Sequence, residues 1–149
     1  MFRGQFFHSM DDKGRVSIPA RFREALGGLQ DERLVLSPFA DRGAVGLEAF
    51  PYSVWRDQEK KLRENHRFDV DNLDFIYTSV GLAADCAPDA QGRILVPPDL
   101  RAEARLGRDI AFSGHIDSFR LWDAATWRAV LQKAKQVYAN ASNLTKLSV

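Results

Sequence analysis

Two copies of a short motif, Asp-x-x-Gly-Arg, carry the residues whose types and spacing could do chemistry. The first is Asp11-Asp12-Lys13-Gly14-Arg15 and the second is Asp89-Ala90-Gln91-Gly92-Arg93. An arginine side chain ends in a planar fork that can hold a phosphate or the O6 and N7 edge of guanine, and a lysine adds a point charge. A glycine directly before the arginine lets the backbone approach a ligand closely. The motif therefore predicts recognition of an anion or a base edge.

The two copies are not equal in charge. Lys13 of the first copy is replaced by Gln91, which could still hydrogen-bond a base or a phosphate. The first copy is also the richer in cations, with five in the first 23 residues: Arg3, Lys13, Arg15, Arg21 and Arg23. We expect the first copy to dominate binding, although a solvated helix face is the favoured interpretation of Arg21 and Arg23.

A purely structural role for the two motif arginines is also open. Arg15 and Arg93 each follow an aspartate by four residues, and an ion pair with Asp11 or Asp89 would lock the turn. Both roles are compatible if the aspartates orient the arginines toward a ligand. Aspartate is a poor phosphate contact, so Asp11 and Asp89 are assigned a supporting role, together with Gly14 and Gly92.

The motifs belong to a longer internal repeat. The segment 11–19 realigns on 89–97 without a gap, and Phe22-Arg23 falls on Leu100-Arg101. Further on, 34–37 corresponds to 110–113, so the unit is about 45 to 50 residues long and occurs twice. A unit of this size buries too little surface to be stable alone. We expect the two copies to pack on each other as a pseudo-dimeric barrel, closed or nearly closed.

Hydrophobic periodicity predicts the same order of elements, ββαββ, in each copy. Strands are expected at 6–10, from Arg15, at 34–37 and at 44–49, and again at 82–86, from Arg93, at 109–113 and at 119–122. Short helices should begin at Pro19 and Pro97 and end at Gly27 and Gly107. Amphipathic helices should span 51–65 and 123–139, with Asp123 as N-cap, and a further short helix should include 73–80.

The sequence thus predicts a mixed fold, mainly β with helices. The expected organisation is a first repeat at 5–50, a helical connector at 51–80, a second repeat at 81–124, and a C-terminal helix and tail at 125–149. Trp55, Trp122 and Trp127 lie at strand and helix-stripe spacing, which favours a place in the core over base stacking.

Composition excludes several classes of function. The net charge is only +1, and 45% of the residues are hydrophobic, with no apolar run of the roughly 18 residues that span a bilayer. A single cysteine, Cys86, indicates a reduced cytoplasmic setting, and His8, His66 and His115 lack metal-ligand spacing. No catalytic motif is present. We expect no enzyme activity, cofactor, metal, membrane or small-molecule substrate.

Three segments together resemble the MraZ family: MFRGQFFHSMDDKGRVSIPARFR, DAQGRILVPPDLR and FSGHIDSFRLWDAATW. The resemblance runs from Met1 to roughly Lys135. It implies two repeats similar to the swapped-hairpin domains of the AbrB and SpoVT regulators. It also implies a nucleoid-associated ring oligomer that binds direct repeats of double-stranded DNA upstream of the division and cell-wall gene cluster and represses its own operon. The turns would then face DNA through Lys13, Arg15, Arg93, Gln91 and Arg3.

Two alternatives remain. The first is an AbrB-type antitoxin or transition-state regulator, which typically has one such unit per chain, so that two units count against it. The second is an oligomeric scaffold that binds proteins and never touches DNA. The near-neutral net charge favours this scaffold slightly.

Overall fold

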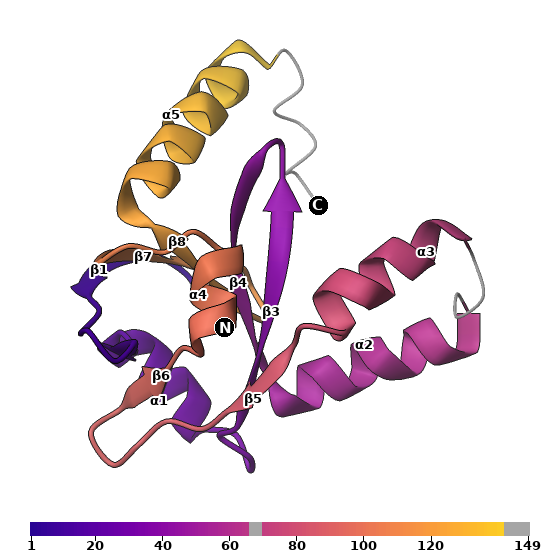
Figure 1. Cartoon of the computed structure of the whole chain (residues 1–149). Helices are drawn as coiled ribbons and strands as arrows, with labels where there is room; N and C mark the ends of the chain where they lie inside the picture. Colours follow the sequence, from indigo (N-terminus) through magenta and orange to yellow (C-terminus); the bar gives the residue numbers. More distant parts are fainter. Residues whose placement is uncertain (66–69, 142–149) are drawn as a thin grey trace.

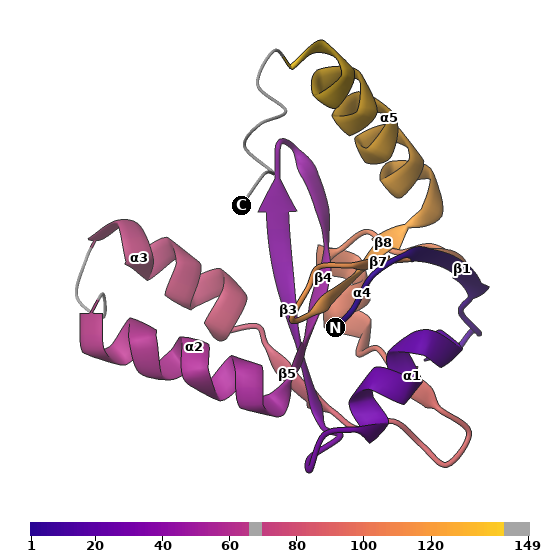
Figure 2. The same cartoon turned by 180° about the vertical axis from the view of Figure 1, so that it is seen from behind.

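The computed structural model describes residues 1–65 and 70–141, shown from two sides in Figures 1 and 2. The elements of the first copy are β1 (Gln5–Ser9), β2 (Arg15–Ser17), α1 (Ala20–Gly27), β3 (Leu34–Asp41) and β4 (Ala44–Pro51). The elements of the second copy are β5 (Ala84–Cys86), β6 (Arg93–Leu95), α4 (Pro98–Glu103), β7 (Asp109–Gly114) and β8 (Phe119–Asp123). Between them lie α2 (Tyr52–Asn65), α3 (Val70–Phe75) and the π-helical η1 (Ile76–Val80), and α5 (Ala124–Asn140) comes last.

The predicted mixed, mainly β fold and the order ββαββ in each copy are confirmed. Pro19 and Pro97 are the N-cap residues of α1 and α4, directly before each short helix. Some boundaries were wrong. The helix end predicted at Gly107 lies at Glu103 of α4, and Arg105, two residues further on, has a positive φ of 52°. Strand β3 runs to Asp41, beyond its predicted end at residue 37. Of the predicted C-terminal tail, 142–149 lie outside the described residues.

The strands of the two copies are interleaved in the sheets. The larger sheet is six-stranded in the order β1-β7-β8-β4-β3-β5, and β2 pairs with β6 in a two-stranded sheet. Thus β1 of the first copy pairs with β7 of the second, and β5 of the second pairs with β3 of the first, all antiparallel. Neither copy forms its sheet alone, as expected for a unit too small to bury its own core. Closure into a swapped-hairpin barrel stays a prediction.

The core is shared in the same way. Phe22 of the first copy lies 4.9 Å, centroid to centroid, from Phe119 of the second, and Phe2 packs edge-on against Phe22 at 5.5 Å. The rings of Phe2, Phe22 and Phe119 are at most 1% exposed. Such aromatic contacts favour edge-to-face and tilted geometries over a face-to-face sandwich. Apolar residues of both copies therefore share the main hydrophobic core, and Val35, Phe50 and Trp55 form a second, smaller cluster.

The tryptophans are structural. Trp55 and Trp122 are buried, as predicted, and the indole N–H of Trp122 donates to Ser113 Oγ at 2.9 Å. Trp127 is half-buried, lies 5.5 Å from the Trp122 ring, and donates its indole N–H to Gln5 Oε1 at 2.8 Å. All three indoles thus help to fix helices to the sheet.

The helices flank the long β3–β4 hairpin. In both views α2 and α3 lie next to each other on one side of this hairpin, and α5 lies on its other side (Figures 1 and 2). Asp123 occupies the N-cap position of α5, as predicted, but its side chain makes no capping hydrogen bond and instead accepts the Gly107 N–H at 3.2 Å. Within the described residues, no helix is long and apolar enough to cross a bilayer.

Candidate nucleic-acid interface

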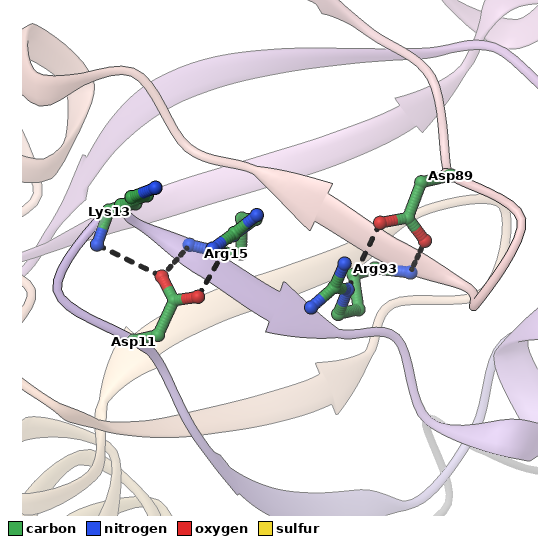
Figure 3. A network of polar contacts seen from close by, with 5 residues as sticks. All are labelled: Asp11, Lys13, Arg15, Asp89 and Arg93. Atoms are coloured by element: carbon green, nitrogen blue, oxygen red, sulfur yellow. Dashed lines mark hydrogen bonds and ion pairs between the residues drawn. The ribbon is translucent and has the colours of Figure 1, made fainter.

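The first Asp-x-x-Gly-Arg segment is a tight turn between β1 and β2. The Asp11 carboxylate accepts the backbone N–H of Lys13 at 3.0 Å and of Arg15 at 2.9 Å through Oδ1. Its Oδ2 accepts Arg15 Nε at 2.9 Å (Figure 3). Gly14 has a φ of +90°, which an L side chain rarely adopts, and its N–H donates to the Asp11 carbonyl at 3.0 Å. Asp11 and Gly14 together fix the shape of the turn.

The second turn repeats this geometry. Asp89 Oδ1 accepts the N–H groups of Gln91 and Arg93, both at 2.9 Å, and Oδ2 accepts Arg93 Nε at 3.0 Å. Gly92 has a φ of +77°. The predicted aspartate–arginine pairing is therefore confirmed in both copies. Each pair uses only Nε, so the terminal guanidinium nitrogens of Arg15 and Arg93 have no hydrogen-bond partner in the described part of the chain.

The arginines share one face of the β2–β6 ribbon. Arg15 is opposite Leu95 and Ser17 is opposite Arg93 in the antiparallel register, which makes the two arginines diagonal neighbours. The residues between them, Val16 and Ile94, point the other way and are each 1% exposed. Because side chains alternate along a strand, burial of that pair directs the arginines outward. Figure 3 shows Arg15 and Arg93 lying between Asp11 and Asp89.

Each turn is held by the opposite half of the chain. The Gly14 carbonyl accepts the N–H of Val96 at 2.8 Å, and the Gly92 carbonyl accepts the N–H of Ile18 at 2.9 Å. Val96 and Ile18 are fully buried. Each turn is therefore anchored to the common core through a buried residue of the other half.

Two arginines lie against the turns: Arg101, which sequence reasoning missed, and Arg23, which it interpreted as part of a solvated helix face. A methyl group on Gly14 would come within 2.9 Å of Arg101 Nε, and one on Gly92 would collide with Cδ of Arg23. Arg101 belongs to the second copy and Arg23 to the first, so each turn has an arginine from the other half beside it. The repeat contained a signal for this role, because Arg23 and Arg101 occupy equivalent positions in the two copies. Arg21, by contrast, aligns with Asp99.

The pKa values of the two turn aspartates, Asp11 and Asp89, are lowered. The pKa of Asp11 is lowered, mainly because the Arg15 backbone N–H donates to the carboxylate, and Arg15 and Lys13 add to this. The pKa of Asp89 is lowered mainly by the Arg93 backbone N–H, with the Gln91 N–H and the Arg93 side chain adding to it. Both carboxylates are thus stabilised in their charged form.

The remaining predicted site residues lie in two places. Lys13 and Gln91 are exposed at the tips of the first and second turn. Arg3 is exposed and precedes β1, whereas the first turn follows β1. The five-residue strand between them is roughly 17 Å long. The structure does not bring Arg3 together with the turns, and its role in DNA binding stays a prediction.

Outside the turns, the described residues include Cys86 and possible metal ligands. Burial raises the pKa of the Cys86 thiol to about 11, so the nucleophilic thiolate is scarce near neutral pH. Among residues 1–65 and 70–141, no three His, Cys, Asp or Glu side chains gather as metal ligands would. His66 lies outside the described residues.

The fold and the site define a class: a duplicated ββαββ protein that presents two arginine turns on one ribbon. The family model described as "MraZ protein, putative antitoxin-like" matches residues 1–75 and 80–147. A protein of Syntrophobacter fumaroxidans named "Transcriptional regulator MraZ" is 37% identical, over 92% of this chain and 89% of its own length. Proteins of the same name are 39% identical in Acidithiobacillus ferrooxidans, over 87% of each chain, and 35% identical in Geobacter sulfurreducens, over 100% of each. The chain belongs to the MraZ family.

Replacing Gly14 tests the contact between the first turn and the other half. Gly14→Ala adds the strain of an L residue at positive φ, a cost of about 1–3 kcal/mol, and places a methyl 2.7 Å from the Val96 carbonyl oxygen. Gly43→Ala is the matched control, because Gly43 has a φ of +84° with nothing within 4 Å of the added methyl. We expect Gly14→Ala to lower the free energy of unfolding, measured in urea, by more than Gly43→Ala does. Equal losses would contradict the contact.

The aspartate pKa shifts predict how stability depends on pH. Because the folded pKa of Asp11 is lowered, its ionised carboxylate stabilises the native state above the ordinary aspartate pKa of about 3.9, and this contribution is lost as the pH falls below that value. Asp11→Asn should therefore be less stable than the unchanged chain at pH 6, and the difference should shrink toward pH 3. Asp12→Asn is the control, since the Asp12 carboxylate accepts no hydrogen bond in the described part of the turn. A difference for Asp11→Asn that stays constant with pH would refute this assignment.

Proposed function

We propose that this chain is a sequence-specific DNA-binding transcriptional regulator whose β2–β6 ribbon is the DNA-facing element. The observation that carries the proposal is the outward, diagonal placement of Arg15 and Arg93 on the ribbon. The major groove of B-DNA is wide enough for a two-stranded ribbon, and arginine bound to guanine O6 and N7 is the commonest specific contact there. The relatives named as transcriptional regulators support the same conclusion.

The aspartates prepare the arginines for this role. The Nε atoms of Arg15 and Arg93 donate to Asp11 and Asp89, which orients each guanidinium group. The terminal nitrogens of each group are then available to donate to a second acceptor. Two parallel N–H donors fit a guanine edge or a phosphate in the bidentate manner. Holding the fork in place before binding reduces the entropy lost when DNA arrives.

Several copies of the binding site in one oligomer would compensate for the low net charge of each chain. A chain of net charge +1 makes few phosphate contacts, and each contributes roughly 0.9 to the slope of log affinity against log salt. We propose a ring-shaped homo-oligomer on direct repeats upstream of the division and cell-wall gene cluster, acting on its own operon in the cytoplasm and associated with the nucleoid. Linked subunits on successive repeats raise affinity without new contacts.

Exposed apolar side chains support an assembly of subunits. Tyr77 is 66% exposed and Phe75 46% exposed. Next to them a cavity of about 210 Å³ opens between α2 and the α3–η1 segment, lined by Trp55, Leu62, Phe75 and Val80 among others. A contiguous exposed apolar patch can mark a protein interaction site, and we propose that another subunit covers these side chains.

Substitution of the two turn arginines tests the function. We expect Arg15→Ala to abolish binding to promoter DNA and Arg93→Ala to weaken it less, because Lys13 accompanies Arg15 whereas the neutral Gln91 accompanies Arg93. Gel-shift titrations at several salt concentrations measure this. Arg63→Ala on α2 is the control for loss of one positive charge, and sedimentation confirms that assembly is unchanged.

Equal losses for the two variants would contradict the ranking of the turns. Wild-type protein without salt-sensitive, sequence-dependent binding would contradict the proposed function and favour a protein-binding scaffold.

A further inference from the structure

A polar pocket of about 620 Å³ lies beside the first turn. One wall comes from Met10 and the first turn. The other comes from the second copy: the end of α4, the segment between α4 and β7, and Asp123 at the end of β8. Its charged lining residues are Asp11, Asp12, Arg101, Arg105, Arg108 and Asp123. The two walls are joined by the Met10 N–H, which donates to the Arg108 carbonyl at 2.8 Å. The pocket is therefore held next to the first turn by a backbone hydrogen bond between the two copies.

The cations of this pocket lack ion-pair partners among the described residues. Across residues 1–65 and 70–141, Arg101, Arg105 and Arg108 make no ion pair. The Nε of Arg101 is buried and has no hydrogen-bond acceptor, which is costly for a charged donor. Arg105 and Arg108 are exposed. Three guanidinium groups around one pocket, one of them with a buried unsatisfied donor, favour an anionic ligand there.

Two of the carboxylates are already engaged. Asp11 is bound by Arg15 and by two turn amides, and Asp123 accepts the Gly107 N–H. By itself the first turn is neutral, since Lys13 and Arg15 balance Asp11 and Asp12. The arginines of the second copy are what add positive charge beside it.

We infer that this pocket binds one phosphate group, and that its occupant is a backbone phosphate of the DNA held by the first turn. That the occupant is a DNA phosphate rests on the proposed function. That the pocket binds a phosphate group does not. Guanidinium groups hold phosphate oxygens through charge-assisted, often bidentate hydrogen bonds. A phosphate contact here would fix the register of the turn on the duplex without reading sequence.

The pocket also distinguishes the two halves. Where the second copy has Arg105-Leu106, the ungapped alignment gives the first copy Gly27-Gly28, so the second turn has no equivalent of Arg105 next to it. Arg23 lies against the second turn as Arg101 lies against the first, but without that further cation. The phosphate site therefore belongs to the first turn alone.

The test compares two double variants that remove the same charge. R105Q/R108Q changes the pocket, and K60Q/R63Q changes two exposed cations on α2. We expect R105Q/R108Q to reduce the slope of log affinity against log salt by roughly 0.9 per subunit bound, the value for one phosphate contact, and to keep the preference for promoter over random DNA. K60Q/R63Q should leave the slope unchanged. Equal slopes for all three proteins would overturn the DNA backbone as the occupant.

A second arm needs no DNA. Inorganic phosphate is titrated against chloride at constant ionic strength, and backbone amide chemical shifts are followed. We expect shifts at Gly107 and Arg108 in the unchanged protein and none in R105Q/R108Q, and no phosphate-specific shifts there would overturn the pocket itself. If phosphate shifts these amides but R105Q/R108Q keeps the wild-type salt slope for DNA, the pocket binds a free phosphate-bearing ligand. That outcome would refute the DNA phosphate as the occupant. If wild-type protein shows no sequence preference, the proposed function fails while this titration still decides the pocket.

Discussion

Two backbone hydrogen bonds that cross between the halves, from Val96 to the Gly14 carbonyl and from Ile18 to the Gly92 carbonyl, are the constraint on which the arrangement depends. They continue the β2–β6 pairing to the turn glycines, so each turn is shaped by residues about 80 positions away in the sequence. Gly14 is needed for this reason as well as for its positive φ, because a methyl group there would lie 2.7 Å from the Val96 carbonyl oxygen. The turn and the core are therefore specified by the same residues.

The electrostatics of the surface follow from this pairing. Within each turn the aspartate and the arginine neutralise each other, and what remains for a ligand is the free edge of a guanidinium group that is already oriented. Positive charge beyond that comes from the other half, Arg101 at the first turn and Arg23 at the second. A chain of near-neutral charge can thus concentrate cations on one ribbon without a strongly basic surface elsewhere.

The local part of the structure could be predicted from the sequence. The repeat predicted the element order, and the four-residue spacing from Asp11 to Arg15 and from Asp89 to Arg93 predicted the ion pairs, because both depend on near neighbours. Strand partners could not be predicted, since a short strand such as β1 carries no signal that chooses β7 over other edges. The role of Arg101 was missed for the same reason, because its neighbour Gly14 is distant in sequence. Asp123 fits an N-cap pattern, yet a loop amide from Gly107 binds its carboxylate instead.

The claim that both turns belong to one cooperative structure is tested most directly by native-state amide hydrogen exchange. The account predicts that the amides of Ile18 and Val96 exchange only through global unfolding, with the same free energy and denaturant dependence as core amides such as Leu36 and Leu47. Exchange of one of the two cross-half amides at a distinctly lower free energy, while the other stays protected, would show that a half opens alone. That result would contradict a surface built jointly by the two halves.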